Sequence, residues 1–565
     1  MKRFSYLMMA SLMALGFGAC SDEVDVPKGG EELSGNVYMS FDLKLPTSRS
    51  TTDADGTTNS DENPDFEVGK EAENKVSAIK VVLATSTDGK SFTHLAESKQ
   101  PEDGASLVGS GTNYTVTFQS SDFEGKAGTE NVYAFVICNP TLDSYANLFV
   151  ENGETATVQD NDLELKESIA KRGAFVMTNA KLTKVGDIPD VAVLKKDYGT
   201  IGNPFDLGTV YVERTAARFD YKSAKEDNKY TMLEDESGKP LVQVELTDMA
   251  LINMSKNYYW LRRVASTSAT PSSVYGDYYD AQNISICGVE TMNSGQYEEG
   301  KVPEGLTPFV VDTDAVTKLD GSATAGNFHY YYWADNGLSS NLDWTPMTYF
   351  SNAESDNWKN NEYKIWRYAT ENTLPSVNSQ LNKYSTGVVF KGKIIEPDDV
   401  EDNKLNGTNN VYVFNDVLYG DWEQVTKAAK ATKGDGSLVD AVLNNAYKIL
   451  TKEGETEPEM ADAVKVGFTV YAPNKDGDYE VYYYYWNRHN DNEDNNSMGI
   501  MEFAVVRNNV YKLSVTNISK FGHPADPTGD PDKPKPDDPD EDDDVYFRVG
   551  VEVLPWVVRV NNIEF

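Results

Sequence analysis

The sequence is poor in the residues that most catalytic and metal sites use. Its 565 residues include three cysteines and four histidines, which are His94, His329, His489 and His523. It contains no CxxC pair and none of the motifs HExxH, GxSxG, GxGxxG or the phosphate-binding P-loop. We therefore expect no catalytic residues, no metal site, no cofactor and a function that is not enzymatic.

Basic residues are scarce beside acidic ones, with 51 Lys and Arg against 90 Asp and Glu and a net charge of −39. A chain of this charge is repelled by the phosphates of nucleic acids and of anionic membranes, so we exclude both as electrostatic partners. The length exceeds what one core usually serves, which predicts two or three domains. The 33 tyrosines, the alternating apolar patterns and the frequent Gly, Asn and Asp turns predict a mainly β fold.

The N-terminus has the pattern of a targeting segment. Lys2 and Arg3 precede the apolar run LMMASLMALGFGA, which is too short to cross a bilayer and ends at Cys20. The stretch FGAC resembles a bacterial lipobox, in which Cys20 is acylated and becomes the new N-terminus. The alternative is a plain secretory signal followed by a stray cysteine. The next residues, SDEVD, resemble the acidic tag that directs Bacteroidetes lipoproteins to the cell surface.

A regular strand pattern in GNVYMSFDLKLPTSRS ends in one arginine. Apolar side chains alternate along it, as in a half-buried β-strand, at Val37, Met39, Phe41, Leu43 and Leu45. From Ser50 the chain continues as STTDADGTTNSDENP, which is almost without apolar residues that burial could stabilise. Arg49 is therefore expected at an exposed hinge. The other basic pairs, Lys171-Arg172 and Arg262-Arg263, lie in apolar or β-patterned sequence and are expected to be folded and protected.

The remaining cysteines, Cys138 and Cys287, lie in the apolar runs VYAFVICNP and NISICGVE. Buried thiols are the expectation, although an exported protein could also form a disulfide between them.

The sequence pattern predicts two β domains in succession. The first would contain the strands SAIKVVLATS, NYTVTFQS and NVYAFVIC. VYVERTAARFDYK and VQVELTDMALINMSKNYYWLRR read as strands that open a second one. DWEQVTKAAKA and SLVDAVLNNAYKIL predict two short helices.

An acidic segment with six prolines, residues 523–544, precedes the last apolar stretch. We expect it to stay extended without packing, and in a polyproline-like form it could reach about 68 Å. In the last stretch, apolar residues alternate up to Leu554 and Pro555 and then resume in the opposite phase, which predicts a bulge. These residues are Val545, Phe547, Val549, Val551, Val553, Trp556, Val558 and Val560. The alternative is an ordinary last strand of its own domain, but such a strand seldom needs so long a tether.

Two other features could suggest ligand binding. WNRHNDNEDNN places His489 near Asp491, Glu493 and Asp494, but it lacks the ligand spacing of a calcium loop, so we expect a solvated hairpin tip. The aromatic segments FHYYYWADNG and DWTPMTYFSNAESDNWKNNEYKIWRY could stack on sugars or on a protein. Core packing and cross-strand pairing are the more usual roles of such residues.

One long stretch makes the chain recognisable. Residues 482–524, YYYYWNRHNDNEDNNSMGIMEFAVVRNNVYKLSVTNISKFGHP, resemble the C-terminal domain of the minor-fimbrium shaft fimbrillins of Bacteroidales, which build type V pili. VYVERTAARFDYK, DMALINMSKNYYWLRR and STGVVFKGKI match the same family pattern in order. The resemblance covers nearly the whole chain, although residues 65–200 match only in character.

The resemblance implies two β-sandwich domains of transthyretin-like, Greek-key type, with a few short helices. It also implies an outer-membrane lipoprotein precursor that a trypsin-like surface protease cleaves between Arg49 and Ser50. The first strand would then leave a groove, and the C-terminal strand of a neighbour would fill it. The expected parts are a signal peptide (1–19), a propeptide with the removable strand (20–49), an N-terminal domain (50–208), a C-terminal domain (209–522), a tether (523–544) and a donor strand (545–565).

The implied partners are further copies of the chain in a homopolymer, accessory, anchor and tip pilins, and the protease. A tip subunit needs no donor strand, and an anchor should keep its lipid and its first strand. A chain with both a cleavable hinge and a tethered strand is therefore read as a shaft subunit that supports adhesion and colonisation. The alternatives are a monomeric surface lipoprotein that binds glycans and an accessory or tip pilin.

Overall fold

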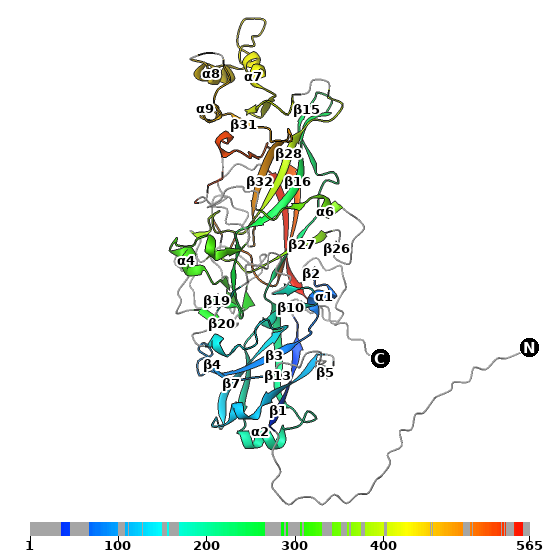
Figure 1. Ribbon diagram of the computed structural model, residues 1–565, viewed down its shortest axis with the longest axis vertical. Coiled ribbons are helices and arrows are strands. Elements are labelled where there is room, and N and C mark those ends of the chain that lie inside the picture. Colours follow the sequence, from blue (N-terminus) through cyan, green and yellow to red (C-terminus); the bar gives the residue numbers. More distant parts are fainter. Residues whose placement is uncertain are drawn as a thin grey trace, which may run out of the picture.

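The computed structural model describes most of the chain from Gly35 to Val557. It covers residues 35–45, 67–99, 108–149 (without 111 and 127), 155–157, 169–265, 284–286, 290–291, 306–307, 310–329, 342–351, 359–360, 363–374, 379–400, 404–489 (without 453 and 455), 498–499, 501–537 (without 533 and 536) and 547–557. Figure 1 shows an elongated molecule with β1 (Asn36–Lys44) and α2 (Val191–Asp197) at one end. The opposite end carries α7 (Trp422–Ala429) and α8 (Ala441–Leu450).

The fold is mainly β, as the sequence predicts, and the helices of the described residues are short. The Greek-key, transthyretin-like topology stays a prediction. Both predicted helices are confirmed. Asp421 caps α7 by accepting from the Gln424 N–H at 2.8 Å, and Asp440 caps α8 by accepting from the Leu443 N–H at 2.8 Å. An aspartate at this position satisfies backbone donors that have no partner inside the helix.

A nine-stranded sheet forms the end of the molecule that contains β1. Its order is β4-β3-β7-β11-β13-β1-β6-β5, and β12 pairs with β7. The sheet curls so that side chains of β1, β3, β6 and β7 share one hydrophobic core. Besides β1, its strands are β3 (Ile79–Thr85), β4 (Thr93–Glu97), β5 (Val108–Ser110), β6 (Asn113–Gln119), β7 (Thr129–Cys138), β11 (Met177–Asn179), β12 (Thr183–Ile188) and β13 (Phe205–Arg214).

Two six-stranded sheets pack face to face in the rest of the molecule. One has the order β2-β35-β33-β14-β27-β26, and the other has β15-β16-β28-β32-β34 with β25 paired to β16. The first contains β2 (Glu67–Val68), β14 (Ala217–Tyr221), β26 (Lys359–Asn360), β27 (Tyr363–Ala369), β33 (Asn509–Ile518) and β35 (Phe547–Val557). The second contains β15 (Lys229–Glu234), β16 (Pro240–Ile252), β25 (Thr345–Pro346), β28 (Gly387–Ile395), β32 (Tyr479–Trp486) and β34 (His523–Pro524).

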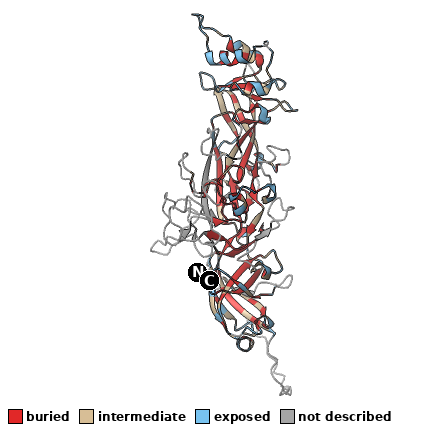
Figure 2. Ribbon diagram, turned by 90° about the vertical axis from the view of Figure 1, so that its left-hand side faces the viewer, coloured by how far each residue is buried: buried red, intermediate tan, exposed pale blue. Residues whose placement is uncertain are grey.

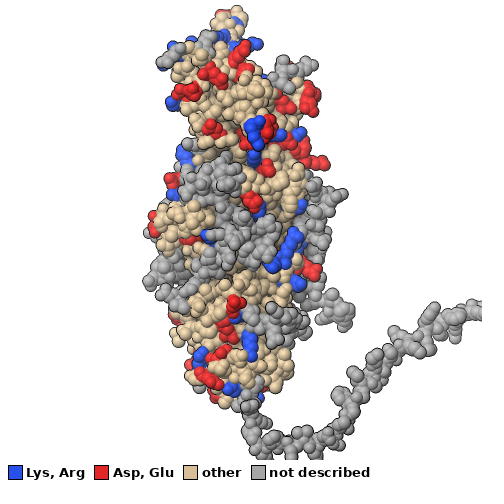
Figure 3. All heavy atoms as spheres, viewed as in Figure 1, with Lys and Arg blue, Asp and Glu red and all other residues tan. Residues whose placement is uncertain are grey.

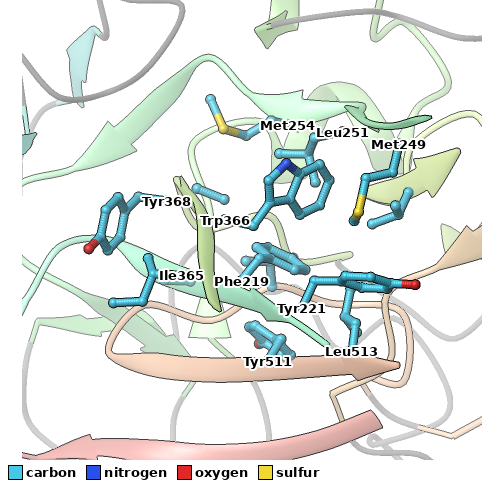
Figure 4. Close-up of a cluster of buried hydrophobic side chains, with 14 of the residues drawn as sticks. Phe219, Tyr221, Met249, Leu251, Met254, Ile365, Trp366, Tyr368, Tyr511 and Leu513 are labelled. Atoms are coloured by element: carbon cyan, nitrogen blue, oxygen red, sulfur yellow. The ribbon is translucent and has the colours of Figure 1, made fainter. Parts of the chain in front are cut away.

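Aromatic side chains fill the space between these two sheets. Figure 4 shows Phe219 and Tyr221 of β14 facing Met249 and Leu251 of β16, with Tyr511 beneath Phe219. The rings of Phe219 and Tyr511 stack with centroids 5.1 Å apart. Such contacts add to the stabilisation that apolar burial already provides. Figure 2 shows the same pattern along the molecule, with buried residues concentrated inside the sheets.

A small module at the far end combines helices with a three-stranded sheet of order β30-β29-β31. The strands are β29 (Val411–Phe414), β30 (Val417–Tyr419) and β31 (Thr469–Tyr471), and α7, α8 and α9 (Met460–Val464) share a core with them. The other short elements are α1 (Glu71–Asn74), α4 (Ala315–Leu319), α6 (Thr348–Ser351), β8 (Thr155–Thr157), β9 (Ala170–Lys171), β10 (Ala174–Phe175), β17 (Met254–Ser255), β18 (Asn257–Tyr259), β19 (Arg263–Ala265), β20 (Ile284–Ile286), β21 (Glu290–Thr291), β22 (Leu306–Thr307), β23 (Val310–Val311) and β24 (Phe328–His329).

The change from the first sheet to the second falls later than the predicted domain boundary at 208. That position lies inside β13, which belongs to the nine-stranded sheet up to Arg214. The next strand, β14, starts at Ala217 and belongs to a six-stranded sheet. We therefore propose 215–216 as the division between the two domains.

Among the described residues, no helix combines the length and apolar character needed to cross a membrane.

Candidate functional site

The predicted first strand lies in the interior of the nine-stranded sheet rather than at its edge. β1 pairs in parallel with β13, with Met39 opposite Phe205, and antiparallel with β6, with Val37 opposite Phe118. Its ends have further bonds, since the Tyr38 N–H donates to the Tyr198 carbonyl at 3.0 Å and the Leu43 N–H to the Thr112 carbonyl at 2.8 Å. The strand therefore occupies a slot between two other strands.

The predicted alternation along β1 is confirmed. Val37, Met39 and Phe41 are 0% exposed and Leu43 is 2% exposed, all within the core that β1 shares with β3 and β7. Leu45 follows the end of the strand and is partly buried against the same core. Full burial of an apolar side chain of this size contributes about 1.5–3 kcal/mol. No covalent bond other than the chain itself joins the described residues of β1 to the sheet.

The processing residues predicted upstream and downstream of β1, Cys20, Arg49 and Ser50, lie outside the described residues. The other basic pairs differ from each other. Arg262 and Arg263 are 7% and 3% exposed, as expected for a folded position. Lys171 and Arg172 are exposed at the turn between β9 and β10, so the prediction that they are sheltered is wrong. This turn is held in place because the Gly173 N–H donates to the Ala72 carbonyl at 2.7 Å.

The C-terminal strand is docked in this single chain. β35 pairs antiparallel with β33 from Asn509 opposite Pro555 to Ile518 opposite Phe547, and in parallel with β2, where Glu67 lies opposite Trp556. In this chain β35 is therefore paired within its own sheet, as the alternative of an ordinary last strand expects. Its backbone contains Phe547, Val549, Val551, Val553 and Trp556, whereas Val545, Val558 and Val560 lie outside the described residues. A register shift occurs between Val515 and Asn517 of β33 rather than at Pro555.

The segment before β35 also differs from its prediction. The sequence predicts that residues 523–544 do not pack, yet β34 (His523–Pro524) pairs with β32, and His523 and Asp530 are 9% and 7% exposed. His523 Nδ1 lies 2.8 Å from the Asp530 carboxylate. Composition alone misses the pairing of β34 with β32, because Val481 and Tyr482 lie far from His523 in the sequence.

His489 is buried rather than placed at a solvated hairpin tip. It is 4% exposed, and burial lowers the pKa of its imidazole to about 4. Its Nδ1 lies 3.0 Å from the Tyr511 hydroxyl, which itself accepts from the Val506 N–H at 2.8 Å. Asp491, Glu493 and Asp494 lie outside the described residues. Within the described part of the chain, no group of three or more His, Cys, Asp or Glu residues could hold a metal ion.

The aromatic segments contribute mostly to cores where they are described. Phe328, Phe350 and Trp366 are 5%, 8% and 9% exposed, and Trp344 packs against a buried cluster. Tyr349 is 37% exposed, and residues 330–341 and Trp358 lie outside the described residues.

Cys138 is a buried thiol without a disulfide, and burial raises its pKa. Cys287 lies outside the described residues.

Sequence reasoning misses a buried charge cluster on the six-stranded sheet that contains β14 and β27. Glu73 of α1 pairs with Arg218 of β14 at 2.9 Å, and Arg218 also pairs with Asp220 at 2.7 Å. The Tyr368 hydroxyl donates to Glu73 at 2.6 Å. The sequence does offer one signal for this cluster. Arg218 and Asp220 alternate with apolar residues in ARFDY, so they lie on the same face of a buried strand, and a buried charge needs a partner of opposite charge.

Charges at the surface form no comparable cluster on the face shown in Figure 3. There, Asp and Glu side chains of the described residues are interspersed with Lys and Arg along the molecule. Surface charge thus indicates no binding site on this face. The position of β1 between β13 and β6, which we call the slot, and the C-terminal strand β35 are the features that most directly suggest an assembly site.

The chain matches known proteins in two ways at the sequence level. Residues 477–562 match the family model of the major fimbrial subunit protein type IV, fimbrillin, C-terminal. Over 599 residues the chain is 23% identical to the minor fimbrium subunit Mfa1 of Porphyromonas gingivalis, covering 100% of both chains. A second Mfa1 sequence of the same species is 23% identical over 604 residues.

Two of the solved structures that the chain resembles come from fimbrial proteins. The fimbrilin FimA of Porphyromonas gingivalis W83 is 13% identical with a TM-score of 0.35, covering 93% of this chain and 98% of that chain. The tip fimbrial protein Mfa3 of Porphyromonas gingivalis, with a C-terminal truncation, is 10% identical with a TM-score of 0.33, covering 92% and 100%. The C-terminal region of this chain is thus similar to the fimbrillin C-terminal family, and over its full length the chain is similar to the minor fimbrium subunit Mfa1 of Porphyromonas gingivalis.

Proposed function

We propose that this chain is a shaft subunit of a type V fimbria that polymerises by strand exchange. In this proposal a protease removes residues 1–49, and β1 leaves the sheet with them. The C-terminal strand of a neighbouring copy then enters the slot between β13 and β6. The role is structural rather than catalytic, and the polymer stands at the cell surface, where it supports adhesion and colonisation.

The position of β1 is the observation that carries the proposal. The strand is the first element of the described residues, it lies between two other strands, and its alternate side chains are buried. Its loss would leave two rows of unpaired backbone groups and an open apolar row, which is costly in water. An added strand restores both the ladder and the core, as in other cases of β-strand addition. β35 has 11 residues and β1 has 9, so β35 is long enough to fill the slot.

The N-terminal sequence supports the two export steps of this proposal, which are lipid attachment and cleavage. Cys20 is the proposed lipid attachment site, and the acyl chain holds the precursor in the outer membrane until cleavage after Arg49 releases it. Accessory, anchor and tip pilins are the proposed heterologous partners, and the relatives include a tip fimbrial protein. The intact precursor keeps its slot filled, so it cannot polymerise before cleavage.

Cleavage is tested with purified precursor treated with trypsin, in the wild type and in Arg49→Ala. We expect the wild type to lose residues 1–49, to begin at Ser50 by N-terminal sequencing and to form fibres, whereas Arg49→Ala stays monomeric. Arg172→Ala is the matched control, because Arg172 is exposed in the hairpin between β9 and β10, and it should polymerise like the wild type. Fibres that retain acylated Cys20, or equal polymerisation of Arg49→Ala, would refute the proposal.

A further inference from the structure

The segment between β33 and β35 is fixed to the body of the subunit at several points. At its start, the Tyr471 hydroxyl donates to the Gly522 carbonyl at 2.6 Å, and β34 pairs with β32 through His523 opposite Tyr482. His523 Nδ1 then lies 2.8 Å from the carboxylate of Asp530. Both side chains are almost fully buried.

A short 3-10 helix, Pro527–Gly529, seats the middle of this segment. Asp526 caps it by accepting from the Thr528 N–H at 2.8 Å. Gly529 lies against the far module so closely that a Cβ atom there would be 2.2 Å from the Val470 carbonyl oxygen and 3.0 Å from Met460 Sδ. Only glycine fits at this approach, because a real Cβ does not come so near a backbone atom.

The end of the segment is attached to a different part of the body. The Asn382 side-chain amide donates to the Lys535 carbonyl at 3.2 Å, and Lys383 Nζ lies 2.6 Å from the Asp537 carboxylate. Asn382 is 1% exposed, whereas Lys535 and Asp537 are exposed, so this end of the segment lies on the surface of the subunit. We call His523–Asp537, apart from residues 533 and 536, the bracket.

The bracket changes how far β35 can extend from the subunit. A segment free from His523 onward could carry Phe547 about 80 Å away, at the extended length of 24 residues. With the bracket seated, only the ten residues from Asp538 to Phe547 follow the anchor at Asp537, which limits the distance from Asp537 to Phe547 to about 35 Å.

We propose that the bracket fixes the point from which β35 leaves the subunit and thereby sets the spacing of neighbouring copies in the polymer. This inference rests on the proposed function, since it requires β35 to enter the slot of a second copy. The slot of that copy must then open within about 35 Å of Asp537. The surface around Asn382 and Lys383 therefore faces the β1, β6 and β13 region of the next subunit.

The first test lengthens the chain beyond the bracket without touching a described contact. Ten Gly and Ser residues are inserted between Asp540 and Glu541, the cleaved full-length chain is polymerised, and electron microscopy measures the axial repeat and the persistence length of the fibres. We expect a broader or longer repeat and at least a twofold shorter persistence length. The same insertion after Gly434, an exposed loop residue, is the control and should leave both values unchanged.

The second test displaces the bracket itself. Gly529→Val places side-chain atoms against Val470, whereas Gly434→Val is a matched control with nothing within 4 Å of the added Cβ. Hydrogen exchange of the peptide 523–532 should rise in Gly529→Val alone, and its fibres should change as those of the insertion variant do. Should Gly529→Val fail to fold, the insertion variant decides.

The outcomes separate this inference from the proposed function. Fibres that form only when β35 is present, but keep the wild-type repeat and stiffness with the insertion, would overturn the bracket and leave strand exchange in place. Fibres that still form after deletion of 545–565 would overturn strand exchange, and the inference with it. A folded Gly529→Val chain with raised exchange and wild-type fibres would also count against the bracket.

Discussion

Glu73 and Arg218 form an ion pair in which both side chains are completely buried, with 2.9 Å between Oε2 and Nη1. Glu73 lies near the start of the chain that would remain after cleavage, and Arg218 lies 145 residues later in β14. The pair therefore ties the N-terminal segment to the second sheet. In the proposed mechanism, the cut can release β1 while this segment stays attached.

The first prediction is that Glu73→Ala lowers the free energy of unfolding by about 3–5 kcal/mol, because it leaves the buried guanidinium of Arg218 with Asp220 as its remaining acidic partner in the cluster. Urea titration at pH 7 measures the change. Glu71→Ala is the matched control, since Glu71 is exposed in the same helix, and we expect a change within about 0.5 kcal/mol. Similar losses in both variants would contradict the structural role of the pair.

The second prediction separates the precursor from the polymer. Met39→Ala removes a side chain that is 0% exposed in β1, so it should destabilise the precursor by about 2–5 kcal/mol. The fibre should be unaffected, because β1 is absent from it under strand exchange. Met254→Ala, at a residue buried in the other core, should destabilise both forms. Denaturant titration of precursor and fibre checks this, and a weaker fibre from Met39→Ala would mean that β1 is retained.

The third prediction concerns deletion of residues 545–565. Since β35 covers the edge of β33 over nearly its whole length, truncation should lower the melting temperature of the monomer as well as prevent fibre formation. A synthetic peptide of the same sequence should restore the melting temperature without restoring fibres. A truncated monomer that melts like the full-length chain would show that the β33–β35 pairing contributes little to stability.

The local parts of this fold follow from the sequence. The alternation of Val37, Met39, Phe41 and Leu43 predicts which face of β1 is buried, because a strand has a period of two. Asp421 and Asp440 mark the starts of α7 and α8 for an equally local reason, as an aspartate caps the residues just after it. The family pattern in the C-terminal region also depends on a contiguous stretch of sequence.

The missed features depend on residues that are distant in the sequence. His489 stands beside acidic residues and reads as solvated, but its environment is set by Tyr511 and Val506. The bracket has a composition typical of a free linker, yet Val470 and Asn382 determine that it packs. Composition predicts whether a segment can form a core by itself, but not whether another core will accept it.

The last prediction uses the pH dependence of stability. The pKa of His489 falls from about 6.5 in the unfolded chain to about 4 when burial removes water from the imidazole. Below pH 6.5 the unfolded chain therefore binds a proton that the folded chain binds only near pH 4. The free energy of unfolding should therefore fall by about 3 kcal/mol as the pH is lowered from 6.5 to 4. His489→Gln should remove this fall from the plot of stability against pH.

Glu97 supplies the control for this measurement. Burial tends to raise the pKa of its carboxyl, but the polar contacts with His94, Lys80 and Ser144 outweigh burial and lower it to about 2. Its contribution to stability is therefore complete above pH 4.5 and is lost as the pH falls toward 2. Glu97→Gln should keep the slope between pH 6.5 and 4.5 that His489→Gln removes. Urea titrations at half-unit pH steps distinguish the two, and an unchanged slope in His489→Gln would mean that another group titrates in this window.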